Sequence, residues 1–451
     1  APPLAAVTYC HADMSDWIER DAAVVWHGFT QMATYADNVP VIVERGEGRE
    51  LIDVDGRRYL DAISSLWVTT LGHRVPELDE ALKDQAGRIA HSTMLGNGNR
   101  VTIELAEALA RVVPVEDPHF LFASDGAAAV EQALKVAFQY WVNIGEDDRS
   151  TYLAFGDAYH GDTVGGLSVG GGGFGSDIFD PLRFPVVRAP GFDDPDCMTA
   201  ATKLIFEHAG ELAAVVVEPL VQGAAGMRMV PADGFRMLAD ACAETGVLLV
   251  CDEVATGFGR TGALFASELC DLRPDLLVVG KGLTGGYLPM AATVANRRVY
   301  DAFLGEDLGP KTLYHGHSYS GNALAAAVAL RHLELILEGD VLSNVRARSA
   351  QLSSLLDERI SPLDSVEEVR LQGLMCGVEL ATGSEDRRGA GSAGPQDRLG
   401  RRVCAAAVER GVLLRPLGDI VVIMPPLTIA SDEIERIVDV LRDSILEVAR
   451  P

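Results

Sequence analysis

Short, uninterrupted apolar runs alternate along much of the chain with longer segments whose apolar residues recur at helical spacing. The runs cover residues 119–124, 151–155, 212–219, 247–253 and 275–280, and the helical spacing is seen at 128–142 and 234–245. Continuous apolar strands separated by helices are typical of a mostly parallel sheet that helices cover on both faces. The pattern therefore predicts an α/β fold, in which binding sites collect at the carboxyl ends of the strands.

The pattern changes from about residue 339 onward, where amphipathic helical segments surround short strands. The helical segments are 343–358, 397–411 and 431–449, and the strands are at 367–380 and 420–426. This part of the chain indicates a second, smaller α+β domain. The run 381–396 is polar and rich in glycine and serine, so we expect a mobile surface loop there.

The composition of the 451 residues, 48% hydrophobic and 23% charged, is ordinary for a globular protein. No apolar run approaches the roughly 20 residues that cross a bilayer, so no membrane span is expected. The net charge of −27 argues against nucleic acid or anionic lipid as a partner, because binding phosphates needs a basic face. The seven cysteines include no CxxC pair, which favours reduced thiols and a cytoplasmic location. Residues 1–20 have no basic start, so we expect a floppy leader rather than a secretory or transit signal.

Two charged residues stand directly at the ends of apolar strands. Asp252 is followed by Glu253 at the end of the run 247–253, and Lys281 follows the run 275–280 and opens a glycine-rich turn. Taken alone, such an aspartate is equally well explained as a satisfied core residue or a helix cap, because a buried carboxylate needs a cation or donor. Taken together, the two residues fit pyridoxal phosphate. The lysine would bond its aldehyde, and the carboxylate would hold the proton on its ring nitrogen.

Two further stretches supply the other parts of such a site. The segment 122–135 predicts a strand, a turn of small residues at Gly126 and Ala127, and then a helix whose first N–H groups suit a phosphate. Tyr159 stands on a glycine-rich loop, where its ring could stack on a pyridine face. Each signal is weak alone, and the combination carries the interpretation.

Six stretches together resemble the class III, fold-type-I pyridoxal-phosphate aminotransferases. They are SDGAAAVEQALK, YHGDT, EPLVQGAAGM, DEVATGFGRTG, GKGLTGGYLPM and HGHSYSGN, and the resemblance runs from about Trp26 to Met424. It implies an enzyme with pyridoxal 5'-phosphate as cofactor. It also implies a large domain at 66–338 with a mostly parallel seven-stranded sheet, and a small α+β domain built from 1–65 and 339–451.

The resemblance also implies roles for individual residues. Lys281 would bond the cofactor and shuttle protons, Asp252 would pair with the ring nitrogen, and Tyr159 and Val254 would lie on the two ring faces. Gly126 and Ala127 would hold the phosphate, and Ser318 would reach the phosphate of the neighbouring subunit. The other implied cofactor-binding residues are His160, Glu218 and His317, and the implied substrate-binding residues are Phe29, Leu66, Trp67, Asp162, Arg260, Gly316 and Arg415.

Stretches outside the cofactor motifs are similar to one branch of this family, the one that acts in biotin synthesis. They include WHGFTQM at 26–32, SSLWVTTLGH at 64–73 and LLRPLGDIVVIMPP at 413–426. The branch transfers an amino group to 8-amino-7-oxononanoate, and Arg415 matches the arginine that binds the carboxylate of this acceptor. The similarity implies two small-molecule partners, an amino donor and the keto acceptor, and a homodimer with shared active sites.

The sequence departs from the family pattern at several positions. The phosphate turn, residues 124–127, reads Ser-Asp-Gly-Ala, so a side-chain hydroxyl of some relatives is missing while the backbone donors remain. Leu66 stands where many relatives have tryptophan, Phe29 where they have tyrosine, and Val422 where they have an aromatic residue. These changes remove contacts that S-adenosylmethionine would favour. We therefore predict lysine or a related terminal diamine, rather than S-adenosylmethionine, as the amino donor.

Three functions remain open from the sequence. The first is the aminotransferase of biotin synthesis. The second is another class III enzyme, acting on a different ω-amine or diamine or carrying out decarboxylation or racemisation. The third is a protein of this fold that has lost catalysis and serves as a binding module, against which the combination of Lys281, Asp252 and Tyr159 argues.

A metal site is not expected. His315 and His317 have the spacing of a metal-binding pair, but no carboxylate or cysteine cluster accompanies them in the glycine-containing loop.

Overall fold

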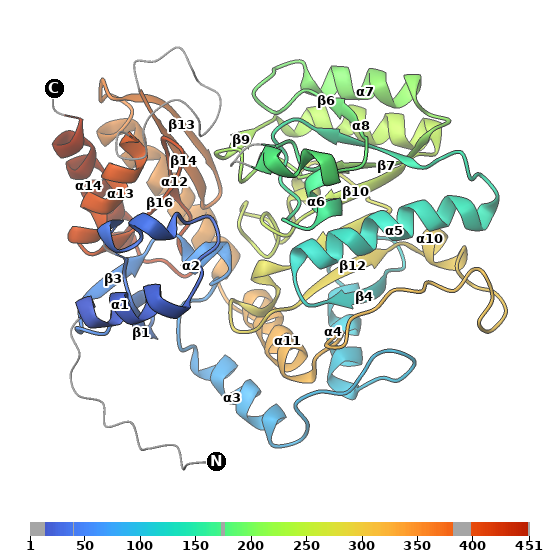
Figure 1. The fold of residues 1–451 in the computed structure, drawn as a ribbon, viewed down its shortest axis with the longest axis horizontal. Helices are drawn as coiled ribbons and strands as arrows, with labels where there is room; N and C mark the ends of the chain where they lie inside the picture. Colours follow the sequence, from blue (N-terminus) through green and yellow to red (C-terminus); the bar gives the residue numbers. More distant parts are fainter. Residues whose placement is uncertain (1–13, 39, 173–175, 382–397, 450–451) are drawn as a thin grey trace.

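The computed structural model describes residues 14–38, 40–172, 176–381 and 398–449. The chain forms two lobes, a larger one around a central sheet and a smaller one that contains both ends of the described chain (Figure 1). Helices and strands alternate through the larger lobe, so the predicted α/β fold is confirmed. The division at residues 66 and 339 stays a prediction.

The larger lobe holds a seven-stranded sheet with strand order β4-β12-β11-β10-β7-β5-β6 among the described residues. Only β12 runs antiparallel to its neighbours β11 and β4, so the prediction of a mostly parallel sheet is confirmed. The strands are β4 (His119–Ala123), β5 (Thr151–Phe155), β6 (Val187–Ala189), β7 (Leu212–Val217), β10 (Leu248–Asp252), β11 (Leu276–Val279) and β12 (Ala291–Ala295).

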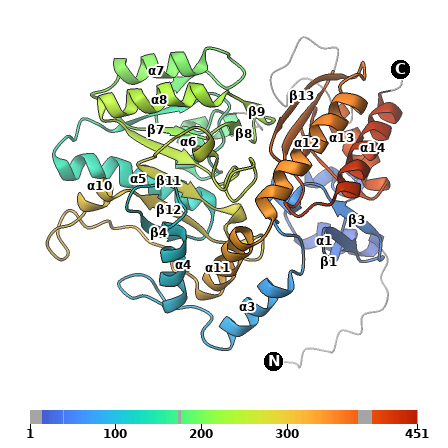
Figure 2. The same cartoon turned by 180° about the vertical axis from the view of Figure 1, so that it is seen from behind.

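Both faces of this sheet are buried because successive side chains of a strand point to opposite faces. Along β7, Val215 and Val217 belong to one apolar cluster, and Ala214 and Val216 belong to another. Helices α5 (Gly126–Ile144), α6 (Val164–Val169) and α10 (Arg297–Asp301) cover one face. Helices α4 (Arg100–Ala110), α7 (Cys197–Glu207), α8 (Ala232–Thr245) and α11 (Ala323–Glu338) cover the other, and Figure 2 shows α4 and α11 from behind.

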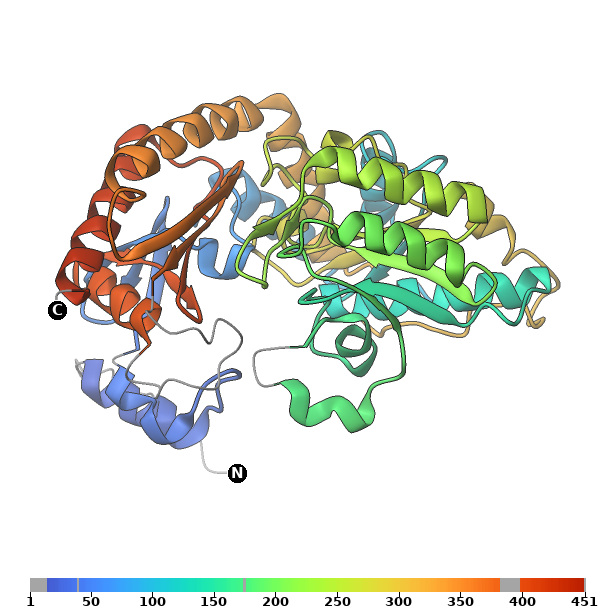
Figure 3. The same cartoon turned by 90° about the horizontal axis from the view of Figure 1, so that it is seen from above.

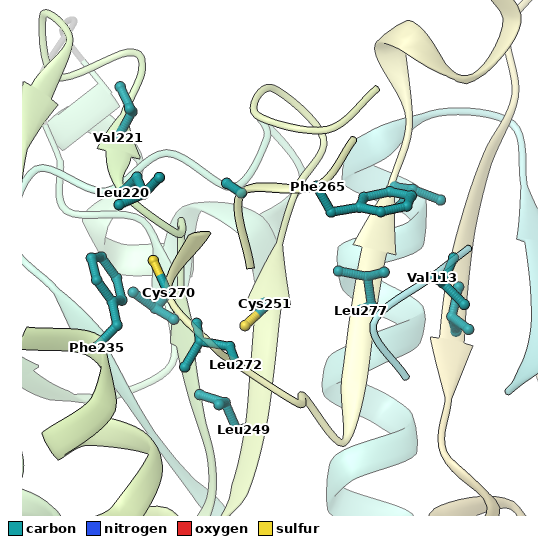
Figure 4. Packing of buried hydrophobic residues seen from close by; sticks show 14 of the residues in the cluster. Val113, Leu220, Val221, Phe235, Leu249, Cys251, Phe265, Cys270, Leu272 and Leu277 are labelled. Atoms are coloured by element: carbon teal, nitrogen blue, oxygen red, sulfur yellow. The ribbon is translucent and has the colours of Figure 1, made fainter. Parts of the chain in front are cut away.

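The packing on the second face is continuous from strand to strand. Leu249 and Cys251 of β10 lie between Phe235 of α8 and Leu277 of β11 (Figure 4). These side chains are at most 3% exposed. The strand ends are therefore held rigidly, which is what a site built on them requires.

The smaller lobe combines the two ends of the described chain, and Figure 3 shows these segments side by side. Strand β15 (Val412–Leu413) pairs in parallel with β3 (Arg58–Asp61), next to β2 (Glu50–Asp53) and β1 (Val43–Glu47). A second sheet has the order β13-β14-β17-β16, with β13 (Val366–Gln372), β14 (Met375–Leu380), β16 (Arg415–Leu417) and β17 (Ile420–Ile423). Helices α12 (Val341–Arg359), α13 (Leu399–Glu409) and α14 (Ser431–Val448) pack against these sheets.

The remaining elements are short connections, apart from α1 and α3. They are α1 (Met14–Val24), α2 (Ser64–Trp67), α3 (Pro76–Ala86), α9 (Ala266–Leu269), β8 (Val221–Gln222), β9 (Arg228–Met229), and the 3₁₀ turns η1 (Met32–Thr34), η2 (Ala36–Asn38), η3 (Ser176–Leu182) and η4 (Lys281–Thr284). In the described part of the chain, no helix is long and apolar enough to cross a membrane.

One sequence expectation needs correction and another cannot be compared. The expected leader at 1–20 is wrong for residues 14–20, which belong to α1. Ile18 of this helix is 9% exposed, so the helix has a buried contact that a leader would lack. Residues 1–13 lie outside the described residues, and so does the expected mobile loop at 381–396 except for Ala381.

Candidate active site

The carboxyl ends of four parallel strands carry the charged and aromatic residues singled out in the sequence. Asp252 ends β10, Lys281 follows β11, Glu218 follows β7, and the loop with Tyr159 and His160 follows β5. Because parallel strands end at the same edge of a sheet, these side chains come together there.

Asp252 is held by two partners on the buried side of this edge. Its Oδ2 lies 2.7 Å from Nδ1 of His160, and its Oδ1 accepts the Val254 backbone N–H at 3.0 Å. Asp252 is 5% exposed and His160 is 2% exposed. The Nε2 atom of His160 has no hydrogen-bond partner among the described residues. The histidine thus fixes the orientation of the carboxylate while one polar atom of its ring remains unsatisfied.

Glu218 is a second buried carboxyl group beside this pair. It accepts the backbone N–H of Tyr159 at 3.1 Å and that of Gly223 at 3.2 Å. Burial raises the pKa of Glu218 to about 7; His160 opposes this rise and the charge of Asp252 adds to it. Glu218 therefore holds together the loops that follow β5 and β7, and its charge changes easily near neutral pH.

The amine of Lys281 lies over the ring of Trp67, 5.1 Å from its centroid. Burial lowers the pKa of Lys281, while the carboxylates of Asp252 and Glu218 act to raise it. A lysine with a lowered pKa is more often uncharged, which is the form that attacks an aldehyde or accepts a proton. Lys281 and Trp67 both adopt positive φ, 37° and 67°, a conformation that non-glycine residues hold only when their surroundings enforce it.

At the start of α5, the backbone lies very close to neighbouring loops of the site. A Cβ atom on Gly126 would lie 2.8 Å from Cγ1 of Val254, and one on Gly161 would lie 2.4 Å from Cβ of Ala127. As first-turn residues, Gly126 and Ala127 have backbone N–H groups without partners inside the helix. The Asp125 carboxylate caps α5 by accepting the Ala128 N–H at 2.9 Å, which leaves the two preceding N–H groups to a ligand.

Tyr159 joins this cluster at its exposed rim. Its hydroxyl donates to the Asp162 carboxylate at 3.0 Å, and Asp162 is exposed. Burial, reinforced by Asp162, raises the pKa of Tyr159, so the phenol is uncharged at neutral pH.

Several residues singled out in the sequence are not part of this cluster within one chain. Phe29 is 70% exposed and Leu66 is 45% exposed. Gly316 and Ser318 are exposed as well, and His317 beside them is half-buried. The backbone carbonyl of Ser318 accepts a hydrogen bond from Nε2 of His91 at 2.7 Å.

The two candidate substrate arginines have different surroundings. Arg260 is 1% exposed and donates to the backbone carbonyls of Pro425 and Thr69, and it forms no ion pair with any residue that the structure describes. Burial lowers its pKa to about 9. Arg415 lies half-buried on β16, and its side chain has no hydrogen bond or ion pair within the part of the chain that the structure describes.

Val422 does not fit the interpretation given to it in the sequence. It is 0% exposed on β17, where it pairs with Arg415 and Gly377, and it belongs to the apolar core. A residue packed in the core gives little information about a donor molecule.

Sequence reasoning missed two glycines that shape the site. Gly161 makes the close approach to Ala127, and Gly223 donates its N–H to Glu218 and lies against the Trp67 ring, where a Cβ atom would be 3.2 Å away. Both glycines stand inside motifs that were recognised, but a single sequence does not show which glycine of a motif makes a close contact.

The described residues contain no group of three or more histidine, cysteine, aspartate or glutamate side chains that could hold a metal ion.

Comparison with known proteins identifies the relatives of this chain. A family model described as aminotransferase class-III matches residues 31–445. The chain is 45% identical over 443 residues to an adenosylmethionine-8-amino-7-oxononanoate aminotransferase of Nitratidesulfovibrio vulgaris, covering 95% of this chain and 81% of the relative. A protein of the same name from Geobacter sulfurreducens is 40% identical over 450 residues, covering 96% and 97%.

Solved structures agree with these relatives. The crystal structure of adenosylmethionine-8-amino-7-oxononanoate aminotransferase from Methanocaldococcus jannaschii superposes with a TM-score of 0.92 at 40% identity, covering 96% of this chain and 99% of that one. An amine transaminase from an uncultivated Pseudomonas species, in its PLP-bound form, gives 0.86 at 33% identity and covers 94% and 98%. The family match spans most of the sequence, both lobes have counterparts in these structures, and this chain belongs to the class III aminotransferases.

Proposed function

We propose that this aminotransferase uses pyridoxal 5'-phosphate to transfer an amino group to 8-amino-7-oxononanoate, which gives 7,8-diaminononanoate in biotin synthesis. The observation that carries the proposal is the pairing of a desolvated lysine with a carboxylate fixed by histidine, at one edge of the sheet. The relatives that bear the name of this activity are 30–45% identical over most of the chain, among them the proteins of Nitratidesulfovibrio vulgaris and Helicobacter pylori.

The residues at the strand ends fit this cofactor. Nε1 of Trp67 and Nε2 of His160 are buried without a partner among the described residues, which is costly unless a ligand or water satisfies them. Gly126 allows α5 to begin in contact with Val254, so the first N–H groups of the helix open toward the same space. A phosphate at this helix end and a ring between Tyr159 and Val254 would fill it.

Each residue then has a defined task. The bound cofactor supplies an electron-withdrawing ring that stabilises negative charge next to the transferred nitrogen. Asp252 would keep the ring nitrogen protonated, and His160 would hold the Asp252 carboxylate in position. Lys281 would bond the aldehyde and move the proton, since its lowered pKa makes the neutral amine accessible. Trp67 would cover the amine of Lys281 against water.

The acceptor we propose is a keto acid with a long aliphatic chain, and its remote carboxylate needs a cation. Arg415 supports this role because its guanidinium has no protein partner among the described residues. Pro416 follows it and stiffens the strand that carries it.

Replacing Arg415 with alanine is expected to raise the KM for 8-amino-7-oxononanoate with little change in the KM for the donor. Losing a charge-assisted partner of a desolvated carboxylate costs roughly 2–5 kcal/mol, which corresponds to a rise in KM of about 30-fold or more. Arg410→Ala is the matched control, because Arg410 lies on the same lobe and pairs with Glu447 at the surface. Equal effects of the two substitutions on the acceptor KM would remove Arg415 from the site.

The donor has two candidates, each supported by an observation. The names of the relatives specify adenosylmethionine, and this is the donor we propose. Lysine is the second candidate, because Phe29 and Leu66 offer fewer polar and aromatic contacts than the usual residues. The buried position of Val422 weakens the case for lysine but leaves that prediction untested.

Assays of the purified, cofactor-loaded protein test the proposal. 8-Amino-7-oxononanoate is supplied with S-adenosylmethionine or with lysine, and 7,8-diaminononanoate is measured by mass spectrometry. The proposal expects product with S-adenosylmethionine. Product with lysine but not with S-adenosylmethionine would make lysine the donor. Turnover of simple ω-amines, with no product from 8-amino-7-oxononanoate, would favour another class III activity. A protein whose absorbance does not respond to any amine would indicate a binding module.

We also propose a homodimer in which Ser318 of each subunit reaches the phosphate site of the other. Large exposed apolar side chains support a covered surface: Trp26 is 89% exposed, Phe29 70% and Tyr319 67%. Because each site would need both subunits, dilution below the dimer dissociation constant is expected to lower specific activity and melting temperature together. Mass photometry at the same concentrations gives the oligomeric state, and a fully active monomer would contradict the proposal.

A cytoplasmic location is part of the proposal as well. Six of the seven cysteines are described, and each is a buried free thiol. Buried unpaired thiols suit a reducing compartment.

A further inference from the structure

A buried hydrogen bond between two distant parts of the chain lies beneath the catalytic lysine. Oγ1 of Thr70 lies 2.6 Å from Nε2 of His332, and both residues are 0% exposed. Thr70 belongs to the segment that follows α2, and His332 lies in the middle of α11. Neither residue has a role in the proposed function.

The turn that carries Lys281 packs directly on this pair. The lysine turn, residues 281–286, begins as η4 and ends in two glycines with positive φ. A Cβ atom on Gly285 would lie 2.9 Å from Cδ2 of His332 and 3.4 Å from Oγ1 of Thr70, and one on Gly282 would lie 3.3 Å from Cγ2 of Thr70. The turn therefore packs closely against the pair, and glycine at position 285 makes this approach possible.

The same segment carries the aromatic ring that faces the amine. Trp67, three residues before Thr70, lies under the amine of Lys281. Between them, Thr69 packs against the far end of the lysine turn, where a Cβ atom on Gly286 would be 2.8 Å from Oγ1 of Thr69. The Thr70–His332 bond thus joins α11, against which the lysine turn packs, to the segment that carries Trp67.

Backbone contacts attach this segment to the smaller lobe. The carbonyl of Thr70 accepts the Leu427 N–H at 2.6 Å, and that of Thr69 accepts Arg260 at 3.4 Å. Leu427 follows β17, the neighbour of the strand with Arg415. The pair therefore lies where the lysine turn, α11 and the smaller lobe meet.

Filling space does not by itself explain a histidine at this position. Burial lowers the pKa of His332 to about 4, with a smaller opposing effect of the Leu283 backbone, so the ring is neutral near pH 7. A leucine would fill a helix interior without desolvating two ring nitrogens. What a leucine could not supply is a directional bond to Thr70.

We propose that the Thr70–His332 hydrogen bond positions the lysine turn, so that the amine of Lys281 stays over Trp67 and beside Asp252 as it moves between partners. Thr70 and His332 are positioning residues and touch neither cofactor nor substrate. The inference rests on the proposed role of Lys281. A misplaced amine would slow the steps in which Lys281 acts and would leave the binding of both substrates nearly unchanged.

Isosteric substitutions test this inference in the full-length protein. Thr70→Val keeps the shape and removes the hydroxyl, whereas Thr70→Ser keeps the hydroxyl. We expect Thr70→Val to lower kcat about 10- to 100-fold while both KM values stay within about twofold of wild type. Thr70→Ser should keep a kcat close to that of the wild-type protein. His332→Leu is expected to match Thr70→Val, and the double variant to be no worse than either, because both remove one bond.

A second readout follows the lysine directly. Cofactor-free protein is mixed with pyridoxal phosphate, quenched with borohydride at set times, and the fraction labelled at Lys281 is measured by mass spectrometry. Thr70→Val should be labelled more slowly by a factor similar to its loss in kcat. Ser444→Ala is the control, because it removes a fully buried hydroxyl bond to Val440 in the smaller lobe, remote from the lysine turn.

The outcomes separate the inference from the proposed function. If the wild-type protein is labelled at Lys281 and Thr70→Val shows the same labelling rate and kcat, the positioning role is overturned and the function stands. A lower melting temperature with unchanged rates, or additive losses in the double variant, would likewise reduce the pair to a structural contact. If the wild-type protein is not labelled at Lys281, both proposals fail.

Discussion

Replacing Lys281 with alanine is expected to lower kcat for amino transfer by about 10²- to 10⁴-fold, because the residue that moves the proton is lost. The fold should survive, since the amine is buried at a cost and its described contact is the face of Trp67. Product formation gives kcat, and circular dichroism with thermal melting gives the stability. Borohydride labelling should disappear from the peptide that contains position 281.

Lys203→Ala is the control for this substitution. Lys203 lies on α7, 3.4 Å from Glu207 in a surface ion pair, and surface pairs contribute little to stability. It should keep wild-type kcat, melting temperature and labelling. Full amino transfer by Lys281→Ala would mean that another amine performs the step, and the assignment of the lysine would have to be abandoned.

The general position of the site was predictable from the sequence, for a geometric reason. Apolar runs that end in Asp252 and before Lys281 predicted parallel strands, and the carboxyl ends of such strands meet at one edge of a sheet. The start of α5 at Gly126 followed from the strand, turn and helix pattern. These predictions depend on the local spacing of apolar residues, which can be recognised directly in the sequence.

The partners of the site residues were not predictable in the same way. That Nδ1 of His160 reaches Asp252 depends on the path of the loop after β5, which has no periodicity. The positive φ of Trp67 and Lys281 could not be predicted either, because a sequence indicates such a conformation only where it has glycine. Contacts of these kinds depend on tertiary packing around the backbone.

Burial explains why some individual residues were misjudged. The sequence did not indicate that Arg260 is buried and donates to backbone carbonyls, and its implied substrate role stays a prediction. His332 was not singled out, because a lone histidine in a helical segment does not by itself predict a functional role. The helix α1 was missed because the composition of residues 1–20 was interpreted as that of a leader; Ile18 is its one buried residue.

The second large effect is expected from Asp252→Asn. An amide keeps the size of the carboxyl group and can still accept the Val254 N–H, but it carries no negative charge to keep a ring nitrogen protonated. Removing one such electrostatic stabiliser is expected to cost about 10²- to 10³-fold in kcat. Substrate KM values should change much less, because the ring nitrogen is not where the substrates bind.

Asp275→Asn is the control that isolates the position of the charge. Asp275 immediately precedes β11 at the opposite edge of the same sheet, where it accepts the Leu249 N–H at 3.0 Å and pairs with Arg298. This variant should lose some stability and keep kcat, whereas Asp252→Asn should keep its fold and lose kcat. Comparing kcat and melting temperature for the two variants therefore separates a charge that acts on the cofactor from one that only holds the sheet. Near-normal turnover in Asp252→Asn would show that another group protonates the ring, and Glu218, whose pKa is raised to about 7, would be the first residue to test.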